Sequence, residues 1–211
     1  MLCPAGSQVM SQGVGESEWY TTHYYGIGGS TGQRPGSTEE YAKITKTTTL
    51  GAISDNGILG IGRHNKLNDI YDGTSNTALF FESSWDGYKG YRGWQRGTYV
   101  SAPGKDYETP ADDGYWHVHS VKYLATPFFV NAGIRAKALG DLSTTSGTGR
   151  FSPYRVTGLW TSHHPGGTNF AAADGTVRFL SETVSNDVFL SLGSAKGGEN
   201  YLYEGPTSAA K

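Results

Sequence analysis

Cysteine and long apolar runs are what this sequence lacks most. Cys3 is the one cysteine among 211 residues, which excludes an intrachain disulfide, and we expect no cysteine-based zinc site. No stretch approaches the roughly 20 apolar residues that span a bilayer. We therefore expect the chain as it stands neither to cross a membrane nor to carry its own export signal.

Charge is also scarce. Charged residues make up 17% of the chain and the formal net charge is −2, whereas general affinity for nucleic acid needs a basic surface. We expect no nucleic-acid partner. The abundant residues are glycine, with 31 copies, and tyrosine, with 14. Such a composition predicts short strands and many turns rather than a helix bundle. We predict a single domain over residues 1–211, α+β and mainly β.

Local patterns place several elements along the chain. Ser185 is a good N-cap residue, and the residues after it favour a short helix. β-forming residues followed by glycine predict a strand that ends at Gly26. The expected elements are strands at residues 19–25, 76–81 and 115–121, one helical turn at 67–70, and a helix at 186–192.

The stretch around Asp174-Gly175 predicts a β-hairpin. An Asp-Gly pair between two β-prone runs is typical of a two-residue type I′ turn. With that pair as the loop, Phe170 lies opposite Phe179. Phe170, Val177 and Phe179 then share one face of the hairpin.

Two blocks of sequence resemble motifs of a known family. His164 lies upstream of Asp174-Gly175 with nine residues between them, which resembles the C-terminal His-x(9)-Asp-Gly signature of a large bacterial family of prepilin-like proteins of unknown function. The second block resembles the family's Asp-Gly-Thr-Ser-Asn-Thr segment with its downstream Glu. The matching residues are His164, Gly166, Gly167, Asp174 and Gly175 in the first block, and Asp72, Gly73, Thr74, Asn76 and Glu82 in the second.

Two shorter matches lie near the ends of the chain. Leu2-Cys3-Pro4 resembles the Cys-Pro that follows the family's N-terminal helix, and Gly197-Gly198-Glu199 resembles its closing Gly-Gly-Glu. Members begin with a prepilin-type cleavage segment and a long apolar helix, followed by an extracytoplasmic domain. The resemblance implies a pilin-like antiparallel sheet domain whose N-terminal helix is absent from this chain.

The resemblance also implies a function. It suggests a structural or assembly subunit similar to a type II secretion pseudopilin or a type IV pilin. Its partners would be other pilin-like subunits or further copies of itself, joined through the missing helix. The full-length precursor would be membrane-anchored and extracytoplasmic, at the cell surface or in the periplasm. The alternative is a surface-anchored module that binds glycan or calcium.

Aromatic residues alternate with glycine and basic residues between residues 85 and 99. Exposed aromatic faces stack on sugar rings, which would suit a glycan. The same side chains also suit core packing or a subunit contact, which we weigh as the commoner fate of aromatics. The possible ligand-binding residues are Trp85, Tyr88, Tyr91 and Trp94.

The densest group of carboxylates comprises Asp106, Glu108, Asp112 and Asp113. Calcium takes carboxylate and carbonyl oxygens from turns. Ordinary turn chemistry explains the same residues, because Asp and Gly favour turn conformations. We therefore expect no cofactor, with calcium as the possible exception at these four residues.

The histidines suggest a zinc site only weakly. His117, His119, His163 and His164 occur as two close pairs, but no His-Glu-x-x-His motif is present. We expect His164 to be held by neighbouring backbone near Ser162 or, less readily, by Asp174. Since the sequence also lacks a Gly-x-Ser-x-Gly nucleophile motif, we expect no enzymatic activity.

Overall fold

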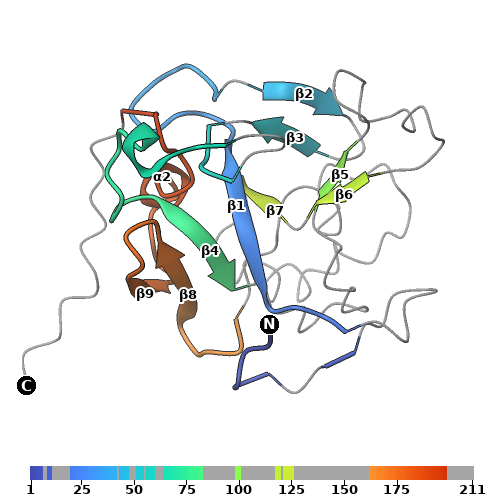
Figure 1. Ribbon diagram of the computed structural model, residues 1–211. Helices are drawn as coiled ribbons and strands as arrows, with labels where there is room; N and C mark the ends of the chain where they lie inside the picture. The colour runs from blue at the N-terminus through green and yellow to red at the C-terminus, as the bar shows by residue number, and fades with distance from the viewer. Residues whose placement is uncertain are drawn as a thin grey trace, which may run out of the picture.

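A computed structural model describes residues 1–6, 9–10, 20–41, 43–47, 51–54, 56–59, 64–82, 98–100, 117–119, 121–125 and 162–198. Its main feature is a five-stranded sheet in the order β7-β1-β4-β8-β9 (Figure 1). The strands of this sheet are β1 (Tyr24–Thr31), β4 (Ala78–Glu82), β7 (Val121–Ala125), β8 (Gly167–Ala172) and β9 (Val177–Ser181).

Four of these strands are antiparallel neighbours, and β7 pairs with β1 in parallel. Two small antiparallel sheets accompany the main one. The first joins β2 (Lys43–Thr47) to β3 (Gly51–Ser54), and the second joins β5 (Thr98–Val100) to β6 (His117–His119). The fold is therefore α+β and mainly β, as predicted.

Helical structure in the described residues is short. A 3-10 turn, η1, covers Leu67–Asp69, and α2 covers Asn186–Ser191. The Ser185 hydroxyl accepts a hydrogen bond from the Val188 amide and caps α2, which confirms the predicted N-cap. No helix among the described residues is long and apolar enough to cross a membrane.

The core lies between α2 and the sheet. Phe189 from α2 meets Phe81 of β4 edge to face, with ring centroids 6.1 Å apart. Phe81 stacks on Phe170 of β8 at 5.2 Å. Ile27 and Leu124 are fully buried beside them. These aromatic and aliphatic contacts fix the order of the central strands.

Strand β1 does not end at Gly26 as predicted, but continues to Thr31. Glycines on both sides let a second segment approach β1. Gly57 donates its amide hydrogen to the Gly28 carbonyl, and a Cβ on Gly57 would collide with the Gly28 backbone, as one on Gly29 would collide with Asn56. Glycine weakens an isolated strand, but here it permits close approach of another backbone.

The predicted register of the β8–β9 hairpin is wrong by one residue. The Gly175 amide donates to the Ala172 carbonyl, and Gly175 has φ +84°. The loop therefore has three residues and ends in a positive-φ glycine, instead of the two residues of a type I′ turn. Phe170 pairs with Arg178 rather than Phe179. A one-residue slip turns a strand over, which explains why Val177 is 71% exposed while Phe170 is buried.

Candidate functional site at one end of the sheet

The sheet brings together residues from three distant segments at the end of β4. Glu82 is the last residue of β4 and pairs with Tyr24, the first residue of β1. His164 lies in the segment that leads into β8, and Cys3 lies near the start of the chain. Figure 1 shows the tip of β4, the start of β1 and the chain's N-terminus close together. We call Cys3, Tyr24, Glu82, Ser162, His164 and Asn169 the Glu82 cluster.

The Glu82 carboxylate is 2% exposed and is the centre of the cluster. Its Oε2 atom accepts a hydrogen bond from the Asn169 amide at 2.7 Å, and from the Asn169 side chain at 3.1 Å. The Ser162 hydroxyl donates to the same oxygen at 2.9 Å. These donors hold the carboxylate in one orientation and compensate for its burial.

The second oxygen of Glu82, Oε1, faces the other members of the cluster. The Tyr24 hydroxyl donates to it at 3.4 Å, and His164 Nε2 lies 3.3 Å from it. The same His164 nitrogen lies 3.6 Å from Cys3 Sγ. The thiol sulfur, one carboxylate oxygen and the imidazole nitrogen all lie within 4.8 Å of one another.

The pKa values reflect this arrangement. Burial raises the pKa of Glu82, but hydrogen bonds from Asn169, Ser162 and Cys3, with the charge of His164, outweigh it and hold the net pKa below the usual value. Burial raises the pKa of Tyr24, and negative charge on Cys3 and Glu82 raises it further. The carboxylate is therefore favoured in its ionised form beside a neutral phenol.

The beginning of the described chain is fixed against this cluster. The Cys3 amide donates to His23 Nδ1 at 3.0 Å, and Cys3 is 3% exposed. The Met1 carbonyl accepts from the His23 amide and from the Thr22 hydroxyl, both at 3.0 Å. Met1 and Cys3 precede β1 by 23 and 21 positions, and they are held by Thr22 and His23 directly before its start.

The cluster does not have the geometry of a catalytic Cys-His-acid triad. In a triad, one ring nitrogen of the histidine faces the nucleophile and the other faces the orienting acid. Here Nε2 of His164 approaches both Cys3 Sγ and Glu82 Oε1. The three groups converge on one point rather than forming a relay, and the absence of enzymatic activity stays a prediction.

The family model that matches residues 1–187 is described as "Protein of unknown function (DUF1559)". The chain belongs to this family. Neither a curated protein nor a solved structure shows a significant match to it. The match of the DUF1559 model includes Cys3, Glu82 and His164 and ends before Gly197.

The structure divides the motif residues of this DUF1559 chain between the two ends of the β4–β8 pair. Glu82 and His164 lie at the end already described, where Gly166 has φ +80° and Gly167 begins β8. At the opposite end, the Asp174 amide donates to the Thr74 carbonyl. The remaining motif residues at that end are Asp72, Gly73, Asn76 and Gly175.

At the opposite end of the β4–β8 pair, several turns are joined by hydrogen bonds. The Asp72 carboxylate accepts from the amides of Gly197 and Gly198 at 2.8 and 2.9 Å. Gly73 has φ +91°, and the Asn76 side chain donates to the Asp72 carbonyl at 3.3 Å. These contacts join the second motif block to the closing Gly-Gly segment, so this end has the character of structural turn chemistry.

Sequence reasoning assigned the wrong partners to His164. Its ring contacts Glu82 and Cys3, whereas Asp174 accepts hydrogen bonds from the amide and hydroxyl of Thr176. The expected contact near Ser162 is present in another form: the His164 backbone amide, and not its ring, donates to the Ser162 hydroxyl. Sequence reasoning missed Tyr24, Ser162 and Asn169 as members of the site, since no local pattern singles them out.

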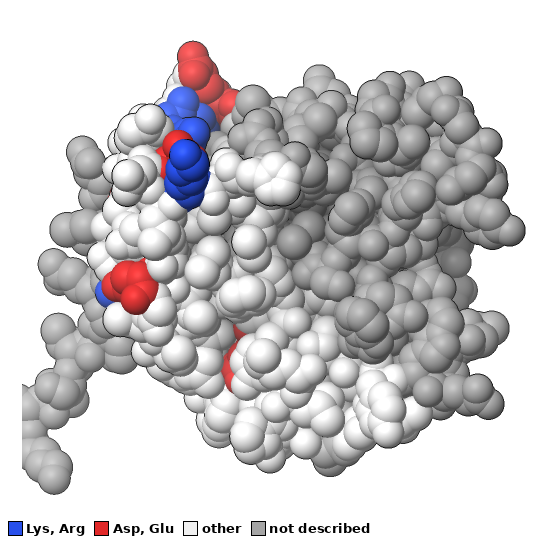
Figure 2. Space-filling model, viewed as in Figure 1, with Lys and Arg blue, Asp and Glu red and all other residues white. Residues whose placement is uncertain are grey.

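The glycan and calcium candidates lie outside the described residues. Trp85, Tyr88, Tyr91 and Trp94 belong to that part of the chain, as do Asp106, Glu108, Asp112 and Asp113. On the face shown in Figure 2, charged side chains of the described residues are few: several lie near its upper edge, and smaller groups lie at the left and low in the centre. The described part of this face therefore presents no broad charged surface.

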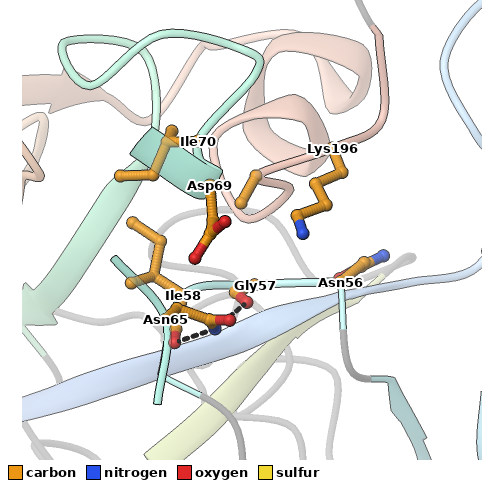
Figure 3. Close-up of a pocket in the computed structure, with 8 residues that line it drawn as sticks. Asn56, Gly57, Ile58, Asn65, Asp69, Ile70 and Lys196 are labelled. Atoms are coloured by element: carbon orange, nitrogen blue, oxygen red, sulfur yellow. Dashed lines mark hydrogen bonds between the residues drawn. The ribbon is translucent and has the colours of Figure 1, made fainter. Parts of the chain in front are cut away.

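A small hollow lies between Asn56, Asn65 and Ile70 (Figure 3). The Asn65 side chain donates to the Ile58 carbonyl at 2.7 Å, and Lys196 and Asp69 stand at its rim. The enclosed space is about that of one water molecule. It is too small for an organic ligand.

Proposed function

We propose that this DUF1559 chain is the extracytoplasmic domain of a pilin-like assembly subunit, similar to a type II secretion pseudopilin or a type IV pilin. The observation that carries the proposal is that the segment from Met1 to Cys3 is attached to the end of the sheet. Met1 is held through its carbonyl and Cys3 through its amide and its burial.

A subunit that assembles through a helix must hold its globular domain at a defined angle to that helix. A flexible linker would let the domain rotate and would scatter the contacts between neighbouring subunits. In this chain, a helix preceding Met1 would join the domain at a point fixed by His23 and Thr22. The N-terminal segment therefore suits a rigid connection, which favours an assembly subunit over a domain on a flexible anchor.

The proposed partners are further pilin-like subunits or copies of the chain, joined through the preceding helix. The proposed location is the cell surface or periplasm, with the precursor anchored in the membrane. The coding sequence upstream of Met1 should then encode a basic stretch, a processing site and about 20 apolar residues.

The decisive experiment changes the rigidity of the connection. Cells producing the full-length protein are labelled with gold-coupled antibodies against this domain and viewed by electron microscopy. We expect labelled filaments or envelope-bound assemblies with the natural protein. An eight-residue Gly-Ser linker, inserted directly before Met1, should abolish them because a Gly-Ser linker is a flexible coil.

The matched control carries the same linker after Lys211 and should assemble normally. Western blots and the thermal midpoint of the purified domain report whether each variant is produced and folded. Filaments that persist with the linker before Met1, or an upstream region without an apolar segment, would contradict the proposal. The glycan and calcium alternatives have no supporting contact among the described residues.

A further inference from the structure

The Glu82 cluster contains three groups that bind transition metals. The Cys3 thiol, the Glu82 carboxylate and the His164 imidazole are each ligands of zinc in proteins. They come from positions 3, 82 and 164, so their meeting follows from the tertiary fold and not from a local motif. Cys3 and Glu82 are buried, whereas the His164 side chain is 36% exposed.

Two of the three distances between these groups match a tetrahedral site, and the third, from Cys3 Sγ to Glu82, is within 4.8 Å. Zinc binds sulfur at about 2.3 Å, imidazole nitrogen at about 2.05 Å and carboxylate oxygen at about 2.1 Å. At tetrahedral angles, the nitrogen then lies about 3.6 Å from the sulfur and about 3.4 Å from the oxygen. The observed distances from His164 Nε2 are 3.6 Å to Cys3 Sγ and 3.3 Å to Glu82 Oε1.

Two protons, one on His164 Nε2 and one on the Cys3 thiol, can bridge at most two of the three contacts at once. One imidazole nitrogen carries at most one proton, so His164 Nε2 cannot donate fully to both neighbours at once. A metal ion accepts electron pairs from all three groups together. A thiolate and a carboxylate carry two negative charges, which a divalent ion neutralises in a largely buried place.

The surrounding residues orient the three groups as a metal site requires. Donors on Glu82 Oε2 turn Oε1 toward His164 and Cys3. The Ser162 hydroxyl accepts from the His164 amide and donates to Glu82, so it fixes both. Partners of this kind hold ligands in place and raise metal affinity.

We propose that Cys3, Glu82 and His164 bind a divalent transition-metal ion of the zinc class, through Sγ, Oε1 and Nε2. Three protein ligands leave the fourth tetrahedral position to water, on the exposed side of His164. This proposal departs from our sequence-based expectation of no cysteine-based zinc site, which did not consider a mixed set of ligands. It is independent of the proposed assembly role.

The test uses the purified 211-residue chain, reduced and freed of metal by a chelator. Co²⁺ replaces Zn²⁺ as a visible probe, because a thiolate bound to Co²⁺ gives a near-ultraviolet charge-transfer band and tetrahedral Co²⁺ absorbs in the visible. We expect both signals to saturate at one Co²⁺ per chain and to disappear when Zn²⁺ is added. Zn²⁺ should also raise the Tm of the chain, and Mg²⁺ should not.

Cys3→Ser should remove the charge-transfer band, and His164→Ala should weaken Zn²⁺ binding at least tenfold. His64 is exposed and lies outside the cluster, so His64→Ala is the matched control and should bind as the natural chain does. Circular dichroism of each metal-free variant reports folding. If a variant is unfolded, the charge-transfer band of the natural chain is compared in buffer and in urea. The proposal requires the band in the folded chain and its loss in the unfolded chain.

Two results would overturn the proposal. The first is a folded natural chain that shows no charge-transfer band at saturating Co²⁺. The second is Zn²⁺ binding that is unchanged in both Cys3→Ser and His164→Ala, which would assign the binding to other groups.

Discussion

The Asn56 side chain hydrogen-bonds to the backbone of Ser30 near the end of β1, as the backbone of a neighbouring strand would. Its Oδ1 accepts from the Ser30 amide at 2.8 Å, and its Nδ2 donates to the Ser30 carbonyl at 3.0 Å. Ser30 is fully buried. The backbone donor and acceptor of Ser30 determine which end of the amide faces which group.

We predict that Asn56→Ala destabilises the fold by roughly 3 kcal/mol. The substitution leaves a buried N–H and a buried C=O without their partner, and each such loss costs about 1–3 kcal/mol. For a domain of this length, each kcal/mol lowers the Tm by about 2–4 °C, so the expected fall is about 6–12 °C. Thermal unfolding followed by circular dichroism, with urea unfolding as a second measure, checks this.

Two further variants make the prediction specific. Asn56→Asp keeps Oδ1 but places a second oxygen against the Ser30 carbonyl, so at pH 7 it should be about as unstable as Asn56→Ala. Asn65→Ala is the control from the same hollow (Figure 3). It should cost about 1 kcal/mol or less, because its hydrogen bond to Ile58 is partly exposed. An Asn56→Ala protein that melts within about 1 °C of the natural chain would refute the reasoning.

Four other substitutions test the turns and the buried carboxylate. Gly175→Ala should lower stability by about 1–2 kcal/mol, since Gly175 has φ +84° and open space around it. Gly175→Asn should lose less stability, and equal Tm values for the natural chain and both Gly175 variants would contradict this. Asp72→Ala should lower the urea midpoint by releasing the amides of Gly197 and Gly198; an unchanged midpoint would mean that solvent replaces both bonds. In metal-free protein, the lowered pKa of Glu82 stabilises the fold above the unfolded pKa of about 4.3, and this stability is lost as the pH falls through the folded pKa. The Tm advantage over Glu82→Gln should therefore shrink between pH 7 and acid pH, and an advantage that grows would have the wrong sign.

Sequence reasoning succeeded where structure depends on neighbouring residues. The N-cap at Ser185 and the turn at residues 67–69 depend on chemistry within one helical turn, and both are present. The hairpin was predicted but its register was not. Asp-Gly suits both a type I′ turn and a three-residue loop that ends in a positive-φ glycine, and these differ by one residue.

Sequence reasoning failed where structure depends on distant segments. The glycines of β1 read as the end of a strand, but Gly28 accepts a hydrogen bond from Gly57 instead. Cys3, Glu82 and His164 each belonged to a recognised block, but only the pairing of β1, β4 and β8 brings the blocks to one place. Strand order and register determine that meeting, and neither is encoded in local spacing.

The separation of Cys3 from His164 by 161 positions has a consequence for folding. Contacts between such distant positions close a long loop, and loops of this kind form slowly and late. The thiol cannot reach the histidine until β4 and β8 have paired, so it remains accessible to oxidants throughout most of folding. In the folded chain Cys3 is 3% exposed, so folding itself ends that access.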